Sequence, residues 1–124
     1  ETLLKPLVDA GVDVIHASNR RFWEPEFDGS SLNLAGWTKK ITGLPTITVG
    51  SVGLESDFIG LYQGEDEVKS APIDDLVKRM DDKEFDMVAV GRALLSDPEW
   101  VNKVKEGRYD EVIPFSKKHA ENYY

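Results

Sequence analysis

Cysteine is absent from this sequence of 124 residues, and histidine occurs only at His16 and His119. The lack of cysteine excludes disulfide bonds, thiolate catalysis and cysteine-ligated zinc or iron–sulfur clusters. Two histidines 103 positions apart are a poor basis for a metal site, so we predict that the protein holds no metal. The chemistry must therefore rest on other groups.

Long apolar runs are also missing, since none approaches the roughly 20 residues that a membrane-spanning helix needs. The start of the sequence shows no basic segment followed by an apolar one, as a secretory signal would. Basic residues are outnumbered, with 15 Lys plus Arg against 23 Asp plus Glu and a net charge of −8, which disfavours sequence-independent binding of nucleic acid. We expect a cytoplasmic protein that binds neither membrane nor nucleic acid.

The overall composition is that of an ordinary globular protein, with 40% hydrophobic and 10% aromatic residues. The chain begins at Glu1, and apolar residues at helical spacing follow at once, at Leu3, Leu4, Leu7 and Val8. This start is typical of a piece cut from a longer chain. We therefore expect residues 1–124 to be a fragment of a larger domain.

Apolar periodicity predicts four helices that alternate with three strands. Short runs rich in β-branched residues predict strands at Val12–Ala17, Thr46–Val49 and Asp86–Val90. Helical spacing predicts a first helix that ends at Gly11 and a second that runs from a cap at Ser30 or Ser31 to Gly43. A third helix is predicted over Pro72–Met80. A fourth is predicted from Pro98 to Gly107, with Val101 and Val104 facing inward.

The remaining segments are less regular. Residues 20–31 read as a loop, Leu94 and Leu95 as a turn, and residues 54–70 as a solvated excursion with a short helix. The tail after Arg108 contains Pro114 and predicts one more short helix.

The spacing of the strands predicts a parallel sheet. Successive strands start 34 and 40 residues apart, which is the scale of one strand with its crossover helix. Three such units can belong to an open doubly wound sheet or to one arc of a (β/α)8 barrel. A complete barrel needs about 250 residues, so this chain would supply little more than a third of one.

Two of the strands end in a glycine followed by a polar residue, Gly50-Ser51 and Gly91-Arg92. A glycine lets the backbone approach an anion, and an arginine forms charge-assisted hydrogen bonds with it. Either pair alone is typical of an ordinary turn. Two such pairs on successive strands favour a phosphate-binding site.

The residues around these pairs resemble a known family. The segments Leu44–Gly53 and Asp86–Val101, the second containing Gly-Arg-Ala-Leu-Leu-Ser-Asp-Pro, resemble the C-terminal part of the Old Yellow Enzyme family of NAD(P)H:flavin oxidoreductases. The resemblance covers nearly the whole chain. It implies an α/β fold made of about strands 6 to 8 of a TIM (β/α)8 barrel, with residues 1–124 as the C-terminal fragment of an FMN-binding domain.

The same resemblance implies a function for the full-length protein. FMN would be bound through its phosphate by Gly50, Ser51, Gly91 and Arg92, NADH or NADPH would be the reductant, and an activated alkene or similar small molecule the acceptor. The family's catalytic residues come from earlier strands, so no catalytic residue is assigned in this chain. The isolated fragment is expected to be inactive, and its two open sheet edges favour self-association into a homo-oligomer.

Two alternatives stay open. Another phosphate-binding TIM-barrel enzyme, a lyase or isomerase, would share the glycine loops but bind a phosphorylated substrate. A flavodoxin-like interaction domain without enzymatic activity is the second, although three strands are few for such a fold.

Further expectations concern individual aromatic residues and His16. The loop residues Phe22 and Trp23 follow a strand and are expected with equal weight to border the active site or to be an inert surface. His16 is expected to be a hydrogen-bonded structural histidine rather than a base. Trp37 and Trp100 lie on helical faces and are expected to pack.

Overall fold

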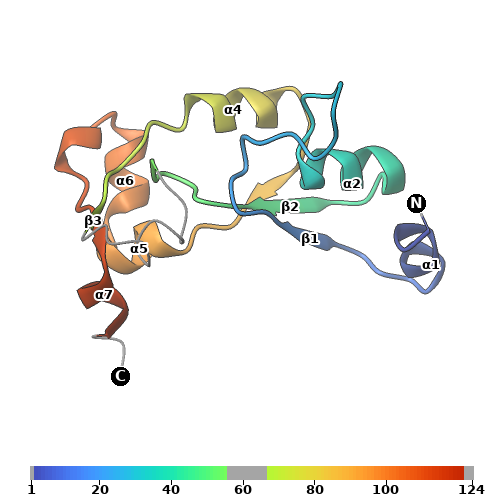
Figure 1. The fold of residues 1–124 in the computed structure, drawn as a ribbon, viewed down its shortest axis with the longest axis horizontal. Helices are drawn as coiled ribbons and strands as arrows, with labels where there is room; N and C mark the ends of the chain where they lie inside the picture. Colours follow the sequence, from blue (N-terminus) through green and yellow to red (C-terminus); the bar gives the residue numbers. More distant parts are fainter. Residues whose placement is uncertain (1, 56–66, 122–124) are drawn as a thin grey trace. The chain divides into compact units, whose positions relative to one another are not determined.

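The computed structural model describes residues 2–55 and 67–121 (Figure 1). The chain forms two compact units, of which the first comprises Glu1–Gly50 and Asp74–Ala89. The second comprises Ser51–Ile73 and Val90–Tyr124.

The first unit is built on a parallel three-stranded sheet of order β1-β2-β4. Its strands are β1 (Ile15–Ser18), β2 (Thr46–Val49) and β4 (Met87–Val88). The predicted parallel pairing is confirmed, although the first and third strands are shorter than their β-branched runs. The chain is therefore a mixed α/β protein.

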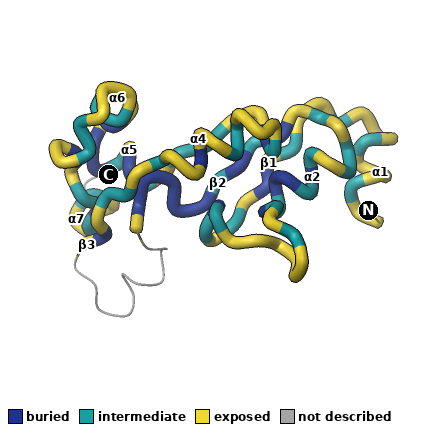
Figure 2. The backbone as a smooth tube through the Cα atoms, turned by 90° about the horizontal axis from the view of Figure 1, so that it is seen from above, coloured by how far each residue is buried: buried dark blue, intermediate teal, exposed yellow. Residues whose placement is uncertain are grey.

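Helices cover one face of this sheet. They are α2 (Leu34–Thr42), which contacts both β1 and β2, and α4 (Asp74–Asp81), which Figure 1 shows on the same side. Helix α1 (Leu4–Asp9) precedes β1 and contacts α2. Alternate strand residues face alternate sides, and the buried ones, Ala17, Thr46 and Thr48, gather along β1 and β2 (Figure 2).

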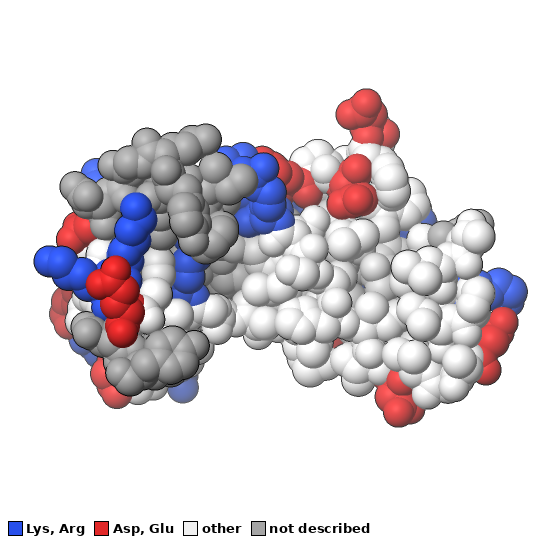
Figure 3. Space-filling model, turned by 60° about the horizontal axis from the view of Figure 1, so that its bottom comes forward, with Lys and Arg blue, Asp and Glu red and all other residues white. Residues whose placement is uncertain are grey.

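The opposite face of the sheet is poorly covered. His16 and Ser18 are exposed there, Met87 is 40% exposed, and Ile47 and Val49 are half-buried. Figure 3 shows few charged side chains on this side of the first unit, at the right of the picture. His16, which the sequence predicts as a hydrogen-bonded structural histidine, is exposed because its position in the alternation places it on the open face.

The start of α2 differs from the prediction. Asn33 is its cap, and the Asn33 Oδ1 atom accepts a hydrogen bond from the Gly36 amide at 2.8 Å. Ser30 instead accepts a hydrogen bond from the Leu32 amide at 3.1 Å and so stabilises the preceding turn. The predicted end at Gly43 is confirmed.

The second unit pairs β3 (Glu67–Val68) with β5 (Phe115–Ser116) in antiparallel orientation. Its helical segments are α5 (Arg92–Ser96), α6 (Trp100–Lys105), η1 (Tyr109–Glu111) and α7 (Lys117–Glu121). The predicted short helix in the tail is confirmed, whereas the one predicted within residues 54–70 falls mainly at 56–66, outside the described residues.

Two predictions about this unit are wrong. Leu94 and Leu95 lie in α5 rather than in a turn, since the amides of both bond back to the Gly91 carbonyl. Val101 is 53% exposed, and the residue that α6 buries is its neighbour Trp100, only 5% exposed. The larger indole surface thus decides which side of α6 faces inward. No helix in the described segments is long and apolar enough to cross a membrane.

Candidate functional site

The structure brings together two of the predicted site residues in the second unit. The Arg92 guanidinium donates a hydrogen bond from Nη2 to Ser51 Oγ at 3.1 Å, although the two residues are 41 positions apart. Ser51 is the second residue after β2, which ends at Val49, and Arg92 is the first residue of α5. The segments that follow the second and third strands of the parallel sheet therefore meet at this hydrogen bond.

The backbone at Ser51 supports a functional reading of this contact. Its φ is 50°, in the left-handed region that residues other than glycine adopt rarely and at a cost. The side chain is 9% exposed and accepts the Arg92 hydrogen bond. Such a conformation persists only where neighbouring contacts fix it, and it is frequent at binding sites.

Arg92 is held by a second contact in the same unit. Its guanidinium carbon lies 5.7 Å from the centre of the Phe115 ring, within the range of a cation–π interaction. Phe115 is buried in β5, and it was not predicted as part of a site because nothing in the sequence links it to Arg92. The ring and Ser51 together limit where the half-buried guanidinium can point.

Gly91 precedes Arg92 and is exposed. A Cβ atom added to Gly91 would meet no heavy atom within 4 Å, although its φ of −104° and ψ of −96° lie outside the regions that residues with a side chain favour. Packing within the described residues therefore does not require glycine here. Open space beside the backbone, next to a guanidinium, is what the approach of an anion needs.

Gly53, the other glycine of the loop after β2, packs against Trp100. Gly53 has a φ of 72°, and an added Cβ would lie 2.6 Å from Trp100 Cζ2. Gly53 is thus a packing glycine that admits the indole, and it is not part of the candidate site.

Asp97 stabilises the segment that follows α5. The carboxylate is 1% exposed and accepts hydrogen bonds from Lys103 Nζ at 2.7 Å, the Ile113 amide at 3.0 Å and the Glu99 amide at 3.0 Å. Burial opposes ionisation of Asp97, but the Lys103 ammonium and the two amides outweigh it and lower the pKa of this carboxyl. Asp97 therefore fixes α6 and the chain before β5.

Gly50, the fourth predicted site residue, is the last residue of the first of the two segments that make up the first unit. Its φ is 153°, and an added Cβ would lie 2.7 Å from the Asn19 carbonyl oxygen and 3.0 Å from the Phe22 nitrogen. The Gly50 carbonyl accepts a hydrogen bond from the Phe22 amide at 3.0 Å. The close approach of the loop after β1 therefore requires glycine at this position.

The aromatic loop after β1 is only partly open. Phe22 is 5% exposed, and its side chain contributes to the core rather than to an exposed surface. Trp23 is half-buried and makes an edge contact with the Phe22 ring at 5.2 Å. Arg79 anchors the loop, because its guanidinium donates to the carbonyls of Ser31 at 3.0 Å and Trp23 at 3.4 Å.

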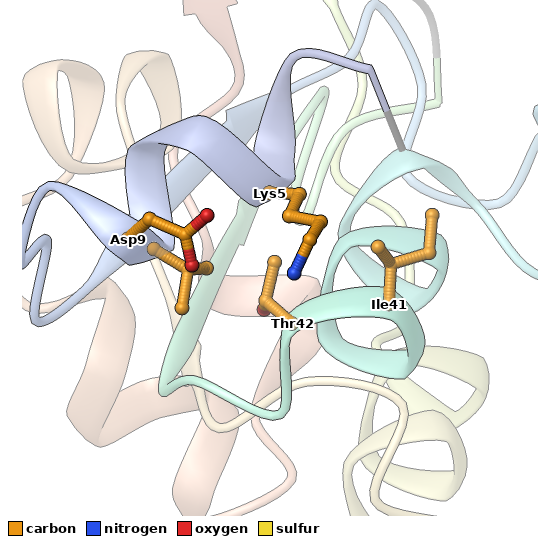
Figure 4. Close-up of a pocket in the computed structure, with 5 residues that line it drawn as sticks. Lys5, Asp9, Ile41 and Thr42 are labelled. Atoms are coloured by element: carbon orange, nitrogen blue, oxygen red, sulfur yellow. The ribbon is translucent and has the colours of Figure 1, made fainter.

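A pocket of about 360 Å³ lies elsewhere in the first unit (Figure 4). It lies between α1 and α2 and is lined by Lys5, Val8, Asp9, Ile41 and Thr42. These residues precede β1 and β2 in the sequence, whereas the predicted site residues follow β2 and β4. Within the described segments no group of three or more potential ligands could hold a metal ion.

The fold and the site thus define a mixed α/β chain with a parallel sheet and a polar site after two of its strands. No protein-family model matches the chain. The chain is similar to an NADH oxidase from Thermoanaerobacter brockii, with 35% identity over 118 residues. The alignment covers 89% of this chain but 15% of the oxidase, and it relates the chain to a part of an oxidoreductase.

Proposed function

We propose that this chain is the C-terminal part of an FMN-dependent NAD(P)H oxidoreductase of the Old Yellow Enzyme type. In this proposal β1, β2 and β4 are about the sixth to eighth strands of a TIM barrel. The similarity to an NADH oxidase and the sequential parallel order of the strands support it. The hydride chemistry would belong to the flavin when it is bound, with NADH or NADPH as reductant and an activated alkene or similar molecule as acceptor.

The contact between Ser51 and Arg92 carries the proposal. A phosphate in a barrel is commonly held by the loops that follow the last two strands, and these two residues follow β2 and β4. Arg92 would supply the charge, and Ser51 would orient the guanidinium through its hydroxyl while offering its amide to the phosphate. Gly91 would leave the space that the phosphate fills, since no side chain is needed there for packing.

Two properties of Arg92 and Gly91 suit the binding of a phosphate group. The guanidinium is half-buried and oriented by Ser51 and Phe115, and the backbone beside it is open at Gly91. Desolvation and orientation both strengthen a charge-assisted hydrogen bond. The role of this part of the protein is therefore binding and orientation of the cofactor.

The test is Arg92→Ala in the full-length protein. Each charge-assisted hydrogen bond contributes about 1.5 to 3 kcal/mol, so losing one weakens FMN binding roughly 10- to 150-fold. Arg108→Ala is the matched control, because Arg108 is another half-buried arginine of the same unit and pairs with Glu106 and Glu111. FMN retention through dialysis, followed by visible absorbance, measures the effect. Wild-type retention in Arg92→Ala would contradict the phosphate role.

A further inference from the structure

Asn33 forms more hydrogen bonds than the cap of a helix requires. Its side chain is fully buried, and Oδ1 accepts the Gly36 amide as the cap of α2. Its Nδ2 donates to the Phe22 carbonyl at 2.8 Å and to Thr48 Oγ1 at 3.2 Å. A serine or aspartate would also cap the helix. The amide nitrogen therefore has a separate task, because burying it is costly unless it is hydrogen-bonded.

That task concerns the backbone of Phe22. Asn33 fixes its carbonyl, the buried ring fixes its side chain, and its amide donates to the Gly50 carbonyl at 3.0 Å. The carbonyl, the ring and the amide of Phe22 are thus all fixed. The amide in turn fixes the position of the Gly50 carbonyl to which it donates. The approach is so close that a side chain at Gly50 would strike the same amide.

The Gly50 carbonyl belongs to the same planar peptide group as the Ser51 amide. In a trans peptide group the carbonyl and the N–H point in opposite directions, and no peptide bond described in the chain is cis. A hydrogen bond that fixes the Gly50 carbonyl therefore also fixes the direction of the Ser51 N–H. This N–H is one of the groups assigned above to the phosphate.

We propose that Asn33 is a positioning residue for the phosphate loop, acting through the Phe22 backbone on the Gly50–Ser51 peptide group. The inference rests on the proposed function, since it assigns the Ser51 amide to the FMN phosphate. Asn33 itself touches no ligand in this account. It sets the orientation of the Ser51 N–H, which shares a peptide group with the Gly50 carbonyl that Phe22 holds.

The test uses Asn33→Ser and Asn33→Asp in the full-length protein. Both retain an oxygen that caps α2, and both lose the amide donor to Phe22. Loss of one neutral hydrogen bond predicts FMN binding weakened roughly 2- to 12-fold. Thr48→Val is the matched control, because it removes the other partner of Nδ2 at an equally buried position and leaves the Phe22 contact in place. It should bind FMN as the wild type does.

The phosphorus NMR signal of bound FMN separates positioning from mere stability. We expect this signal to shift in both Asn33 variants and to remain unchanged in Thr48→Val. A lowered melting temperature with unchanged FMN affinity and phosphorus shift would overturn the proposal, as would failure of both Asn33 variants to fold. If Arg92→Ala weakens FMN and the Asn33 variants do not, this inference alone fails. A wild-type protein that binds no FMN would instead refute the proposed function.

Discussion

Replacement of Gly50 by alanine tests how firmly the end of β2 is locked to the loop after β1. The new Cβ would lie 2.7 Å from the Asn19 carbonyl oxygen and 3.0 Å from the Phe22 nitrogen, and both are backbone atoms that cannot rotate away. Overpacking of this kind costs about 1 to 3 kcal/mol, and a non-glycine residue at this φ adds a similar amount. We expect a loss of about 2 to 6 kcal/mol in local stability.

Amide hydrogen exchange of peptides covering residues 19–24 measures this loss. A destabilisation of that size accelerates exchange through local opening roughly 30- to 25,000-fold. Gly91→Ala is the control, because an added Cβ at Gly91 meets nothing within 4 Å, and exchange in residues 19–24 should not change. Wild-type exchange rates in Gly50→Ala would refute the reasoning, because they would mean that the loop moves away at no cost.

Three further predictions concern other parts of the chain. Asp97→Ala removes a buried partner of Lys103 and should destabilise the second unit by about 3 to 5 kcal/mol in urea-dependent hydrogen exchange. The pKa of Asp97 in the folded protein lies below its ordinary value of 3.8, so its contribution to the stability of the second unit is complete above pH 3.8. This contribution is lost as the pH falls through the lowered pKa. A stability that does not fall on acidification would contradict this. Trp23→Ala in the full-length protein should change the KM for the acceptor with FMN retained, and unchanged kinetics across several acceptors would make Trp23 an inert surface residue. The isolated 124-residue chain should bind FMN weakly or not at all and should self-associate, and a monomer that binds flavin tightly and oxidises NADH in titration and sedimentation would contradict this.

The sequence predicts the regular part of the fold well, because β-branched runs and helical spacing are local signals. The strand Thr46–Val49 and the helix around Leu76 are found as expected. The errors arise where a tertiary contact decides. Trp100 packs as expected, but Val101 is exposed because α6 turns the indole toward the space that Gly53 leaves, and no local pattern encodes that pairing.

The candidate site divides in the same way. Glycine followed by a polar residue marks Ser51 and Arg92 in the sequence, and the structure joins them by a hydrogen bond. Asn33 could have been found as a cap, since it precedes an amphipathic run. Its second hydrogen bond, to Phe22, depends on a loop that has no periodic pattern. Phe115 is beyond prediction because its contact with Arg92 joins distant segments.

Comparison of FMN with riboflavin, which lacks the phosphate, tests the central claim most directly. Dissociation constants for both ligands are measured in the full-length wild type and in Arg92→Ala by flavin fluorescence. We predict that Arg92→Ala weakens FMN roughly 10- to 150-fold and leaves riboflavin binding unchanged, because only the phosphate loses its hydrogen bonds. Equal losses for the two ligands, or no loss for FMN, would contradict the assignment of Arg92 and its loop to the phosphate.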